Sequence, residues 1–142
     1  MNISDKQQEI IDEFDFFDDW TERYEYIINL GKELPLIEEQ YKTEENLIKG
    51  CQSRVWLHAH KDGNGNVAFT ADSDAILTKG IIALMIRVFS GQTPNDILEA
   101  NTVFIEKIGL KEHLSPTRAN GLVSMIKQIK FYALALQGNN LN

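Results

Sequence analysis

The chain contains a single cysteine, Cys51, among 142 residues, and its thiol is the group best suited to covalent chemistry. Cys51 follows Gly50 and precedes Gln52 and Ser53, just before residues that alternate like a β-strand. A lone cysteine cannot close an internal disulfide, and it cannot supply the several thiolates that an iron–sulfur cluster or a structural zinc ion requires. Three roles therefore remain for Cys51: a buried spectator, a nucleophile, or a carrier of sulfur.

The setting of Cys51 favours a chemical role over a structural one. Free cysteine is commonly buried as a small apolar side chain, which is the simplest alternative. Gly50, however, loosens the backbone on one side, and the polar Gln52 and Ser53 on the other side argue against an apolar core position. Loops held by rigid elements are where catalytic and binding groups concentrate.

The histidines are weaker candidates for chemistry. His58 and His60 are two residues apart and would share one face of a strand, but no third ligand completes a metal site by spacing. We therefore expect a solvated strand face and no metal centre. Either histidine, or His113, could be the base of a cysteine hydrolase with Cys51 as its nucleophile, although nothing in the sequence orients such a base.

Composition excludes several classes of function. The net charge of −7, from 21 acidic and 14 basic side chains, repels a phosphate backbone, so we expect no nucleic-acid partner. The longest nearly apolar stretch, residues 80–89, is interrupted by Arg87 and is shorter than the roughly 20 residues that span a bilayer. The N-terminus shows no basic region followed by an apolar run, so we expect no secretory signal. A solitary thiol suits a reducing compartment, and we expect a cytoplasmic protein.

The chain begins with two amphipathic helices. Ser4 predicts the N-cap of a helix that ends near Phe16, and Asp19 predicts the N-cap of a second helix, which Pro35 stops. Residues 9–25 hold eight acids and one base. This run indicates either two solvated helix faces or an acidic docking surface, and the solvated faces are favoured.

A β-hairpin is predicted next. Residues 54–60 alternate between an apolar and a polar face, residues 62–66 have the composition of a turn, and residues 67–71 return as the second arm. Leu47 and Ile48 are candidates for a short third strand.

The rest of the chain reads as helical. Asp72 or Ser73 is expected to cap an almost wholly apolar helix over residues 75–89, the central core element. Thr93 and Ser115 each precede a proline, which predicts helices beginning at residues 94 and 116, with a short helix over residues 102–110 between them. This order of elements predicts one α+β domain over residues 1–142, with a small antiparallel β-sheet covered by helices.

Three motifs give the chain a resemblance to a known family. They are GCQSRVW at residues 50–56, DSDA at residues 72–75 followed by Lys79-Gly80, and HLSPTRANGL at residues 113–122. In this order and spacing they resemble the SufE family of sulfur-acceptor proteins, and the resemblance spans nearly the whole chain. It implies a fold related to the IscU-type scaffolds, which agrees with the predicted order of elements.

The resemblance also implies a function and partners. It implies a cytosolic protein that binds a SufS-type cysteine desulfurase, takes the sulfane sulfur of that enzyme's persulfide, and stimulates the enzyme. The sulfur would then pass to a SufB-type iron–sulfur scaffold complex. Pyridoxal phosphate belongs to the desulfurase, so the resemblance implies no cofactor for this chain and an accessory role, not that of a stand-alone enzyme. A homodimer is left open.

The resemblance extends to individual positions around the thiol. Cys51 matches the family's sulfur-accepting cysteine, Gln52 is kept beside it, and Asp74 and Arg118 match positions near it. From the residues alone, Asp74 is adequately explained as a helix cap, and Arg118 either favours a thiolate or persulfide anion at Cys51 or pairs with a carboxylate in solvent. We expect Cys51 to rest against apolar side chains and to swing out on Gly50 when the desulfurase docks.

Three alternatives stay open beside the sulfur carrier. One is a stand-alone cysteine hydrolase that uses Cys51, and another is a cluster scaffold of related fold, which the single cysteine disfavours. The third is a non-catalytic interaction domain that docks through its acidic helices. A hydrolase would turn over acyl or amide substrates without a partner, whereas a sulfur acceptor would be inert alone.

Overall fold

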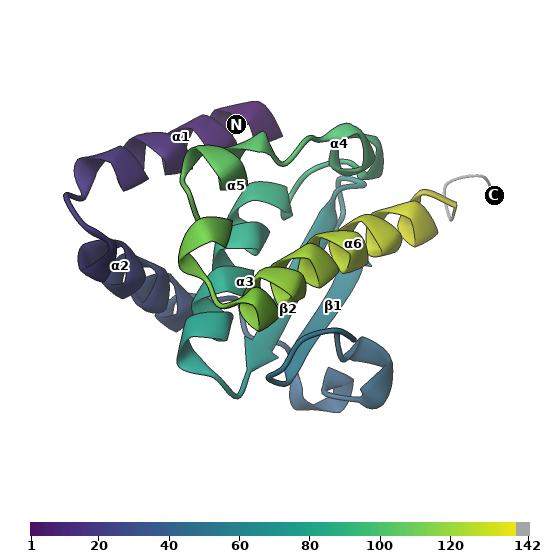
Figure 1. Ribbon diagram of the computed structural model, residues 1–142. Coiled ribbons are helices and arrows are strands. Elements are labelled where there is room, and N and C mark those ends of the chain that lie inside the picture. The colour runs from purple at the N-terminus through teal and green to yellow at the C-terminus, as the bar shows by residue number, and fades with distance from the viewer. Residues whose placement is uncertain (139–142) are drawn as a thin grey trace.

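The computed structural model describes residues 1–138 and shows helices packed around one β-hairpin (Figure 1). A central helix, α3, has α2 and α1 on one side and the hairpin on the other, and the long α6 crosses in front of them. The elements are α1 (Ile3–Phe16), α2 (Trp20–Lys32), β1 (Val55–Lys61), β2 (Val67–Ser73), α3 (Ile76–Phe89), α4 (Pro94–Glu99), α5 (Val103–Lys107) and α6 (Pro116–Gly138), with short 3₁₀ turns η1 (Glu39–Tyr41), η2 (Glu44–Asn46) and η3 (Lys111–His113). The predicted α+β class is confirmed.

The first two helices begin at side-chain caps, one of them misplaced by the sequence prediction. Asp19 caps α2, because its carboxylate accepts a hydrogen bond from the Glu22 amide at 2.9 Å. The predicted cap at Ser4 is wrong: Asn2 caps α1 by accepting from the Asp5 amide at 2.8 Å, so Ser4 lies in the first turn. An asparagine oxygen serves this role at least as well as a serine hydroxyl.

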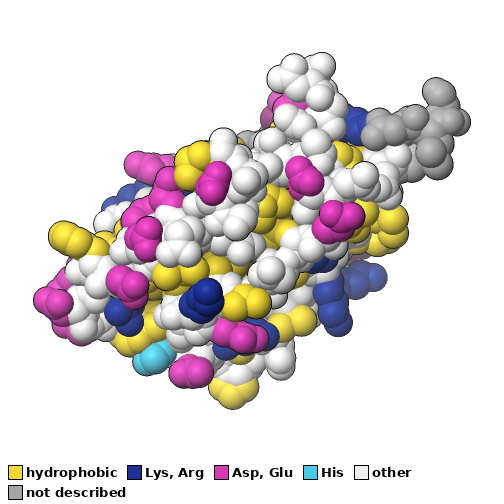
Figure 2. All heavy atoms as spheres, turned by 90° about the horizontal axis from the view of Figure 1, so that it is seen from above, with side chains coloured by type: hydrophobic (Ala, Val, Ile, Leu, Met, Phe, Trp, Pro, Cys, Tyr) yellow, Lys and Arg dark blue, Asp and Glu magenta, His cyan; other side chains and the backbone are white. Residues whose placement is uncertain are grey.

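The acidic run of residues 9–25 is divided between structural and exposed side chains. Glu9 and Glu13 form ion pairs with Arg87 of α3, and these pairs join α1 to the central helix. The run's single base, Arg23, donates to the backbone oxygens of Phe14 and Phe17 at 3.2 and 3.1 Å, which fixes the corner between α1 and α2. Figure 2 shows acidic side chains scattered over the face seen from above α1.

The predicted hairpin is present, with its second arm longer than expected. β1 and β2 pair antiparallel from Val55 opposite Ser73 to Lys61 opposite Val67. The candidate third strand is reduced to one isolated bridge, Leu47 with Trp56. The chain turns away after that bridge, since Gly50 takes a positive φ of 95°.

The central helix packs against α2 without intervening side chains. A Cβ added to Gly80 of α3 would lie 2.2 Å from the backbone oxygen of Ile27, and one added to Gly31 would lie 3.0 Å from the backbone nitrogen of Gly80. Only glycine permits this approach, because no larger residue leaves room for the facing backbone. The largest fully buried side chains of α3 include Ile82, Leu84 and Phe89.

The predicted capping of α3 by Asp72 or Ser73 is wrong. The N-cap residue is Ala75, which has no side-chain hydrogen bond to offer. Asp72 instead forms ion pairs with Lys42 at 2.8 Å and Lys79 at 3.3 Å, because β2 continues two residues beyond the predicted end and carries Asp72 along the strand.

The remaining helices begin where the sequence predicts. Thr93 caps α4, accepting from the Asp96 amide at 3.1 Å, and Ser115 accepts from the Arg118 amide at 3.3 Å at the start of α6. The short helix predicted over residues 102–110 is confined to α5, and Gly109 follows it with a positive φ of 71°. Within residues 1–138, no helix has both the length and the apolar character needed to cross a membrane.

Candidate functional site at Cys51

Cys51 lies in a short loop that leaves Gly50 and enters β1. Gly50 has a φ of +95°, and a Cβ added to it would lie 2.5 Å from the Ser124 hydroxyl oxygen of α6. The position therefore needs glycine both for its backbone conformation and for its contact with α6. The sequence predicted a loosened backbone at Gly50 and gave no sign of Ser124.

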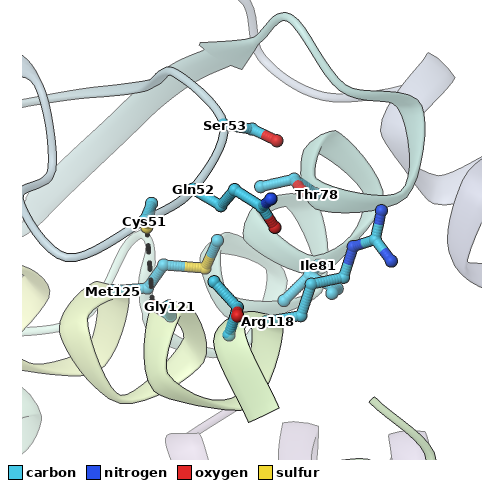
Figure 3. A pocket seen from close by; sticks show the side chains of 9 residues that line it. Cys51, Gln52, Ser53, Thr78, Ile81, Arg118, Gly121 and Met125 are labelled. Atoms are coloured by element: carbon cyan, nitrogen blue, oxygen red, sulfur yellow. Dashed lines mark hydrogen bonds between the residues drawn. The ribbon is translucent and has the colours of Figure 1, made fainter. Parts of the chain in front are cut away.

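The thiol of Cys51 is half-buried against α6. Its Sγ donates a weak hydrogen bond to the backbone oxygen of Gly121 at 3.7 Å, drawn as a dashed line in Figure 3. The buried side chains of Met125 and Ile81 line the same space, so α6 and α3 both shelter the sulfur. Burial raises the pKa of the Cys51 thiol above its ordinary value, because the charged thiolate is poorly solvated there.

A cavity of about 10 Å³ lies beside the thiol. Its walls come from the Cys51 loop, the start of α3 and the first turns of α6, and its lining includes Gln52, Thr78 and Arg118. A volume of about this size is close to the least that one water molecule needs. The thiol is therefore closely covered, with little free space beside it.

Asp74 anchors the far end of the Cys51 loop and does not cap α3. Its carboxylate accepts a hydrogen bond from the Arg54 amide at 3.0 Å, and the Asp74 amide donates back to the Arg54 oxygen at 3.2 Å. The Ser73 hydroxyl donates to the same Arg54 oxygen at 2.8 Å. Asp74 thus holds the backbone three residues beyond the thiol, and it does not belong to the lining of the thiol cavity.

Arg118 lines the cavity without pointing at the sulfur. Figure 3 shows its side chain running along the cavity and its guanidinium turned away from Cys51. The raised pKa of the thiol follows from burial. Stabilisation of a thiolate or persulfide anion by Arg118 stays a prediction that would require the arginine or the loop to move.

Gln52 is the polar neighbour of the thiol. Its exposed side chain lies between Cys51 and Thr78 in Figure 3, at the cavity that both residues line. Its amide is therefore placed to meet any group that enters from solvent.

Sequence reasoning missed the residues of α6 and α3 that form the sheltered side of the cavity. Gly121 and Met125 are four residues apart on α6, so they occupy one helix face. A Cβ on Gly121 would come within 3.4 Å of the Cys51 sulfur, so the glycine lets the thiol lie directly against the helix. The HLSPTRANGL motif contains Gly121, but its contact with Cys51 depends on tertiary packing across 70 residues.

The three histidines are engaged away from the thiol. His58 stacks on Tyr41 with ring centroids 3.8 Å apart, and His113 stacks on Trp20 at 3.9 Å. Burial and the neighbouring His60 lower the pKa of His58. In the described chain no histidine lines the Cys51 cavity, so the hydrolase alternative gains no base from this arrangement.

Comparison with known proteins gives a family for this chain. Residues 8–133 match SufE, described as an Fe-S metabolism associated domain. An uncharacterized SufE-like protein of Rhizobium meliloti is 45% identical over 126 residues, covering 86% of this chain and 90% of that protein. A second from Rhizobium etli is 46% identical over 127 residues, covering 86% of this chain and 85% of its own length.

Two further relatives extend the comparison. A SufE-like protein of Arabidopsis thaliana, described as chloroplastic/mitochondrial, is 40% identical over 132 residues, which cover 93% of this chain and 36% of the plant protein. The solution structure of a hypothetical protein from Thermus thermophilus has the same fold, with a TM-score of 0.78, 20% identity, and coverage of 94% of this chain and 96% of the other. A match over most of the chain, together with relatives of this identity, shows that the chain belongs to the SufE family, whose domain is associated with iron–sulfur metabolism.

Proposed function

We propose that Cys51 accepts sulfane sulfur from the persulfide of a SufS-type cysteine desulfurase and carries it to a SufB-type iron–sulfur scaffold complex. The observation that carries this proposal is the position of Cys51: it is a solitary thiol on a glycine-flanked loop, beside a cavity of about 10 Å³. Such a loop can present the thiol to a partner, while α3 and α6 cover it in the free chain. Membership of a family associated with iron–sulfur metabolism supports the same reading.

The proposed transfer needs one thiol and no cofactor on this chain. The Cys51 thiolate attacks the terminal sulfur of the desulfurase persulfide, so a bond forms between Sγ and that sulfur as the enzyme's own S–S bond breaks. The electron pair of the broken bond leaves on the desulfurase cysteine, and the proton lost by Cys51 neutralises that thiolate or passes to solvent. The sulfane sulfur keeps its oxidation level, so no external oxidant or reductant takes part. Pyridoxal phosphate acts in the partner, where cysteine is desulfurated.

Delivery is the same exchange in reverse. A nucleophile on the scaffold side attacks the terminal sulfur of the Cys51 persulfide, and Cys51 returns to its thiol form. The reaction suits a reducing compartment such as the cytoplasm, where thiols stay reduced between turnovers.

Burial of Cys51 supports a carrier that is inert until it docks. A thiol with a raised pKa is mostly protonated at neutral pH, and the protonated form is a poor nucleophile. Docking of the desulfurase would draw Cys51 out on Gly50 and expose it to water and to the persulfide. We expect slow alkylation of free Cys51 by iodoacetamide and faster alkylation when a desulfurase lacking its own reactive cysteine is added. Alkylation that is fast in the free chain and unchanged by the desulfurase would contradict this sheltering.

The direct test of the proposed function is mass spectrometry of the Cys51 peptide. Incubation with cysteine and a SufS-type desulfurase should add about 32 Da, the mass of one sulfur atom, to that peptide. The variant Cys51→Ser should lose both the added mass and the stimulation of the desulfurase while still binding it. If the wild-type peptide gains no mass, the carrier function is wrong. If the chain alone hydrolyses acyl or amide substrates, the hydrolase alternative replaces it.

A further inference from the structure

A groove lies directly beside the Cys51 loop, outside the cavity that shelters the thiol. It has a volume of about 430 Å³ and runs between the segment of residues 44–49 and the outer face of α6. Leu47 and Phe131 give the groove its apolar surface, and Lys49 and Lys127 border it. Ser124, the residue on which Gly50 packs, also lines it. The groove and the thiol loop therefore share a boundary.

One large apolar side chain of α6 that lines this groove is left in solvent: Phe131 is 60% exposed. Leu134, nearly one turn later on α6, is 56% exposed but does not line the groove. Neither belongs to the buried stripe of α6, which consists of residues such as Leu122, Ile129 and Ala133. A single exposed apolar residue is ordinary, but Phe131 shares the lining of a groove with the apolar Leu47.

The wall opposite α6 is fixed by hydrogen bonds. The Tyr132 hydroxyl has one proton, which it can donate to the Asn46 side-chain oxygen at 2.7 Å or to the backbone oxygen of Leu57 at 3.0 Å. The Asn46 amide donates to the Tyr41 backbone oxygen at 2.7 Å. Tyr132 thus holds α6 against its neighbours in either case, so the groove is preformed and loses little conformational entropy on binding.

A donor protein with an interface of ordinary size, centred on Cys51, would also reach this groove. A standard protein interface buries about 800 Å² per partner, which corresponds to a disc of about 16 Å radius. Lys49 is two residues from Cys51, so their Cα atoms are within about 8 Å of each other. Phe131 lies seven positions after Ser124 on α6, which is about 10 Å along the helix axis. An interface of ordinary size centred on the thiol therefore includes both ends of the groove.

We propose that the groove between residues 44–49 and α6 is the docking site for an apolar side chain of the desulfurase that delivers sulfur to Cys51, with Phe131 as the main contact. This inference rests on the proposed function. The polar rim carries charges of both signs, Lys49 and Lys127 with Glu44 and Glu45, around an apolar centre. That arrangement is typical of a protein interface, in which a buried aromatic anchor supplies most of the binding free energy.

Truncation of Phe131 tests the groove, and an equally simple variant serves as the matched control. Phe131→Ala should raise the dissociation constant for the desulfurase, and the carrier concentration that half-saturates its stimulation, by about tenfold. The stimulation at saturation and the alkylation rate of Cys51 in the free chain should stay unchanged, because Phe131 does not line the thiol cavity. Phe16→Ala, which removes an 83% exposed phenylalanine from the α1–α2 corner, should leave both constants unchanged. Phe131→Gln is a second variant that keeps the helix and a side chain of moderate length.

Binding is measured with Cys51→Ser as the background, so that affinity is separated from sulfur transfer. If wild-type chain gains no sulfur but Phe131→Ala still weakens binding tenfold, the proposed function fails and the docking site stands. If the Phe131 variants bind within twofold of the parent, or Phe16→Ala weakens binding equally, the docking inference is overturned. It is also overturned if the Phe131 variants lose only self-association, measured by sedimentation, since the groove would then belong to an interface between two copies.

Discussion

At two places in this molecule a glycine lets the backbone lie directly against a helix. The two places differ in the atoms that an added side chain would meet. At the α2–α3 crossing, a Cβ on Gly80 would lie 2.2 Å from the backbone oxygen and 2.7 Å from the backbone carbon of Ile27. At the thiol loop, a Cβ on Gly50 would lie 2.5 Å from the Ser124 hydroxyl, the end of a small side chain that can rotate. Gly80 is buried in the core, whereas Gly50 is exposed to solvent.

The buried α2–α3 contact contributes to stability, whereas the exposed contact at Gly50 suits the proposed movement of the thiol loop. A contact between two backbones inside a close-packed core cannot relax without moving a helix, so it contributes to a single rigid arrangement. A loop held by one glycine and a few hydrogen bonds at its ends can open at low cost while the core stays intact. The chain therefore places its only thiol, Cys51, on the part of the fold that can move without unfolding.

The largest effect should come from filling the α2–α3 crossing. Gly80→Ala forces a methyl group into the Ile27 backbone, and we expect a loss of about 3 kcal/mol in the free energy of unfolding. In a domain of this size that loss lowers Tm by about 10 °C. The result would be opposite to the intrinsic helix propensity of alanine, which exceeds that of glycine. Thermal unfolding monitored by circular dichroism measures the change.

Gly63→Ala is the matched control for that prediction. Gly63 lies in the β1–β2 turn without a positive φ, and a Cβ there would meet nothing within 4 Å. Its replacement should leave Tm unchanged or slightly raised, because alanine restricts the unfolded chain. Equal losses from Gly80→Ala and Gly63→Ala would mean that the crossing is not the rigid element we describe.

A smaller loss is expected at the thiol loop. Gly50→Ala places a Cβ on a backbone with φ of +95° and against Ser124, which should cost about 1–2 kcal/mol. The added change Ser124→Ala should recover the part of this loss that comes from the contact and leave the part that comes from φ. Urea unfolding of the single and double variants measures both parts. If the double variant is as unstable as the single one, the contact with α6 contributes nothing.

The same comparison shows what the sequence could predict. Periodicity, Asp19, Thr93 and Ser115 located the helices, because each signal acts through hydrogen bonds within a few residues of chain. The predicted cap at Ser4 is wrong because Asn2, two residues earlier, caps α1 instead. The predicted cap of α3 at Asp72 or Ser73 is wrong because β2 extends over both residues. The thiol itself was evident from its uniqueness and from the GCQSRVW motif.

The surroundings of the thiol could not be predicted in the same way. Gly121, Ser124 and Met125 reach Cys51 only when α6 folds back across the hairpin, about 70 residues later in the chain. Asp74 was read as a helix cap because three capping residues precede the helix together, and only the register of β2 turns its carboxylate to the Arg54 amide. Local patterns carry no information on such contacts.

The hydrogen bond from Arg54 to Asp74 gives a way to loosen the loop while leaving the core untouched. Asp74→Ala removes the acceptor, and we expect a loss of about 1 kcal/mol in stability. Because the loop end is then freed, opening should become easier and alkylation of Cys51 by iodoacetamide should rise about fivefold. Asp74→Asn keeps the side-chain oxygen and should stay near the wild-type rate. Unchanged alkylation in Asp74→Ala would remove this residue from control of the loop.

The smallest expected effect is a pH-dependent change in stability at the Glu13–Arg87 ion pair, which joins α1 to α3. Burial alone would raise the pKa of Glu13, but hydrogen bonds from Arg87 and Tyr26 outweigh it and hold the pKa below its ordinary value. A carboxylate with a lowered pKa stabilises the fold above its unfolded pKa of about 4.3, and that contribution is lost as pH falls through the folded pKa. Because Glu13 is one-third exposed, solvent screens the interaction, and we expect Glu13→Gln to cost only about 0.5–1 kcal/mol at pH 7. Urea unfolding of wild type and Glu13→Gln should therefore differ at pH 7 and converge as pH falls through the lowered folded pKa of Glu13. Glu25→Gln, on the exposed face of α2, should match wild type at pH 7. Alkylation of Cys51 should be the same in all three proteins, because none of the residues that pair with Arg87 lines the thiol cavity. A changed alkylation rate in Glu13→Gln would show that the ion pairs of Arg87 and the thiol loop are coupled.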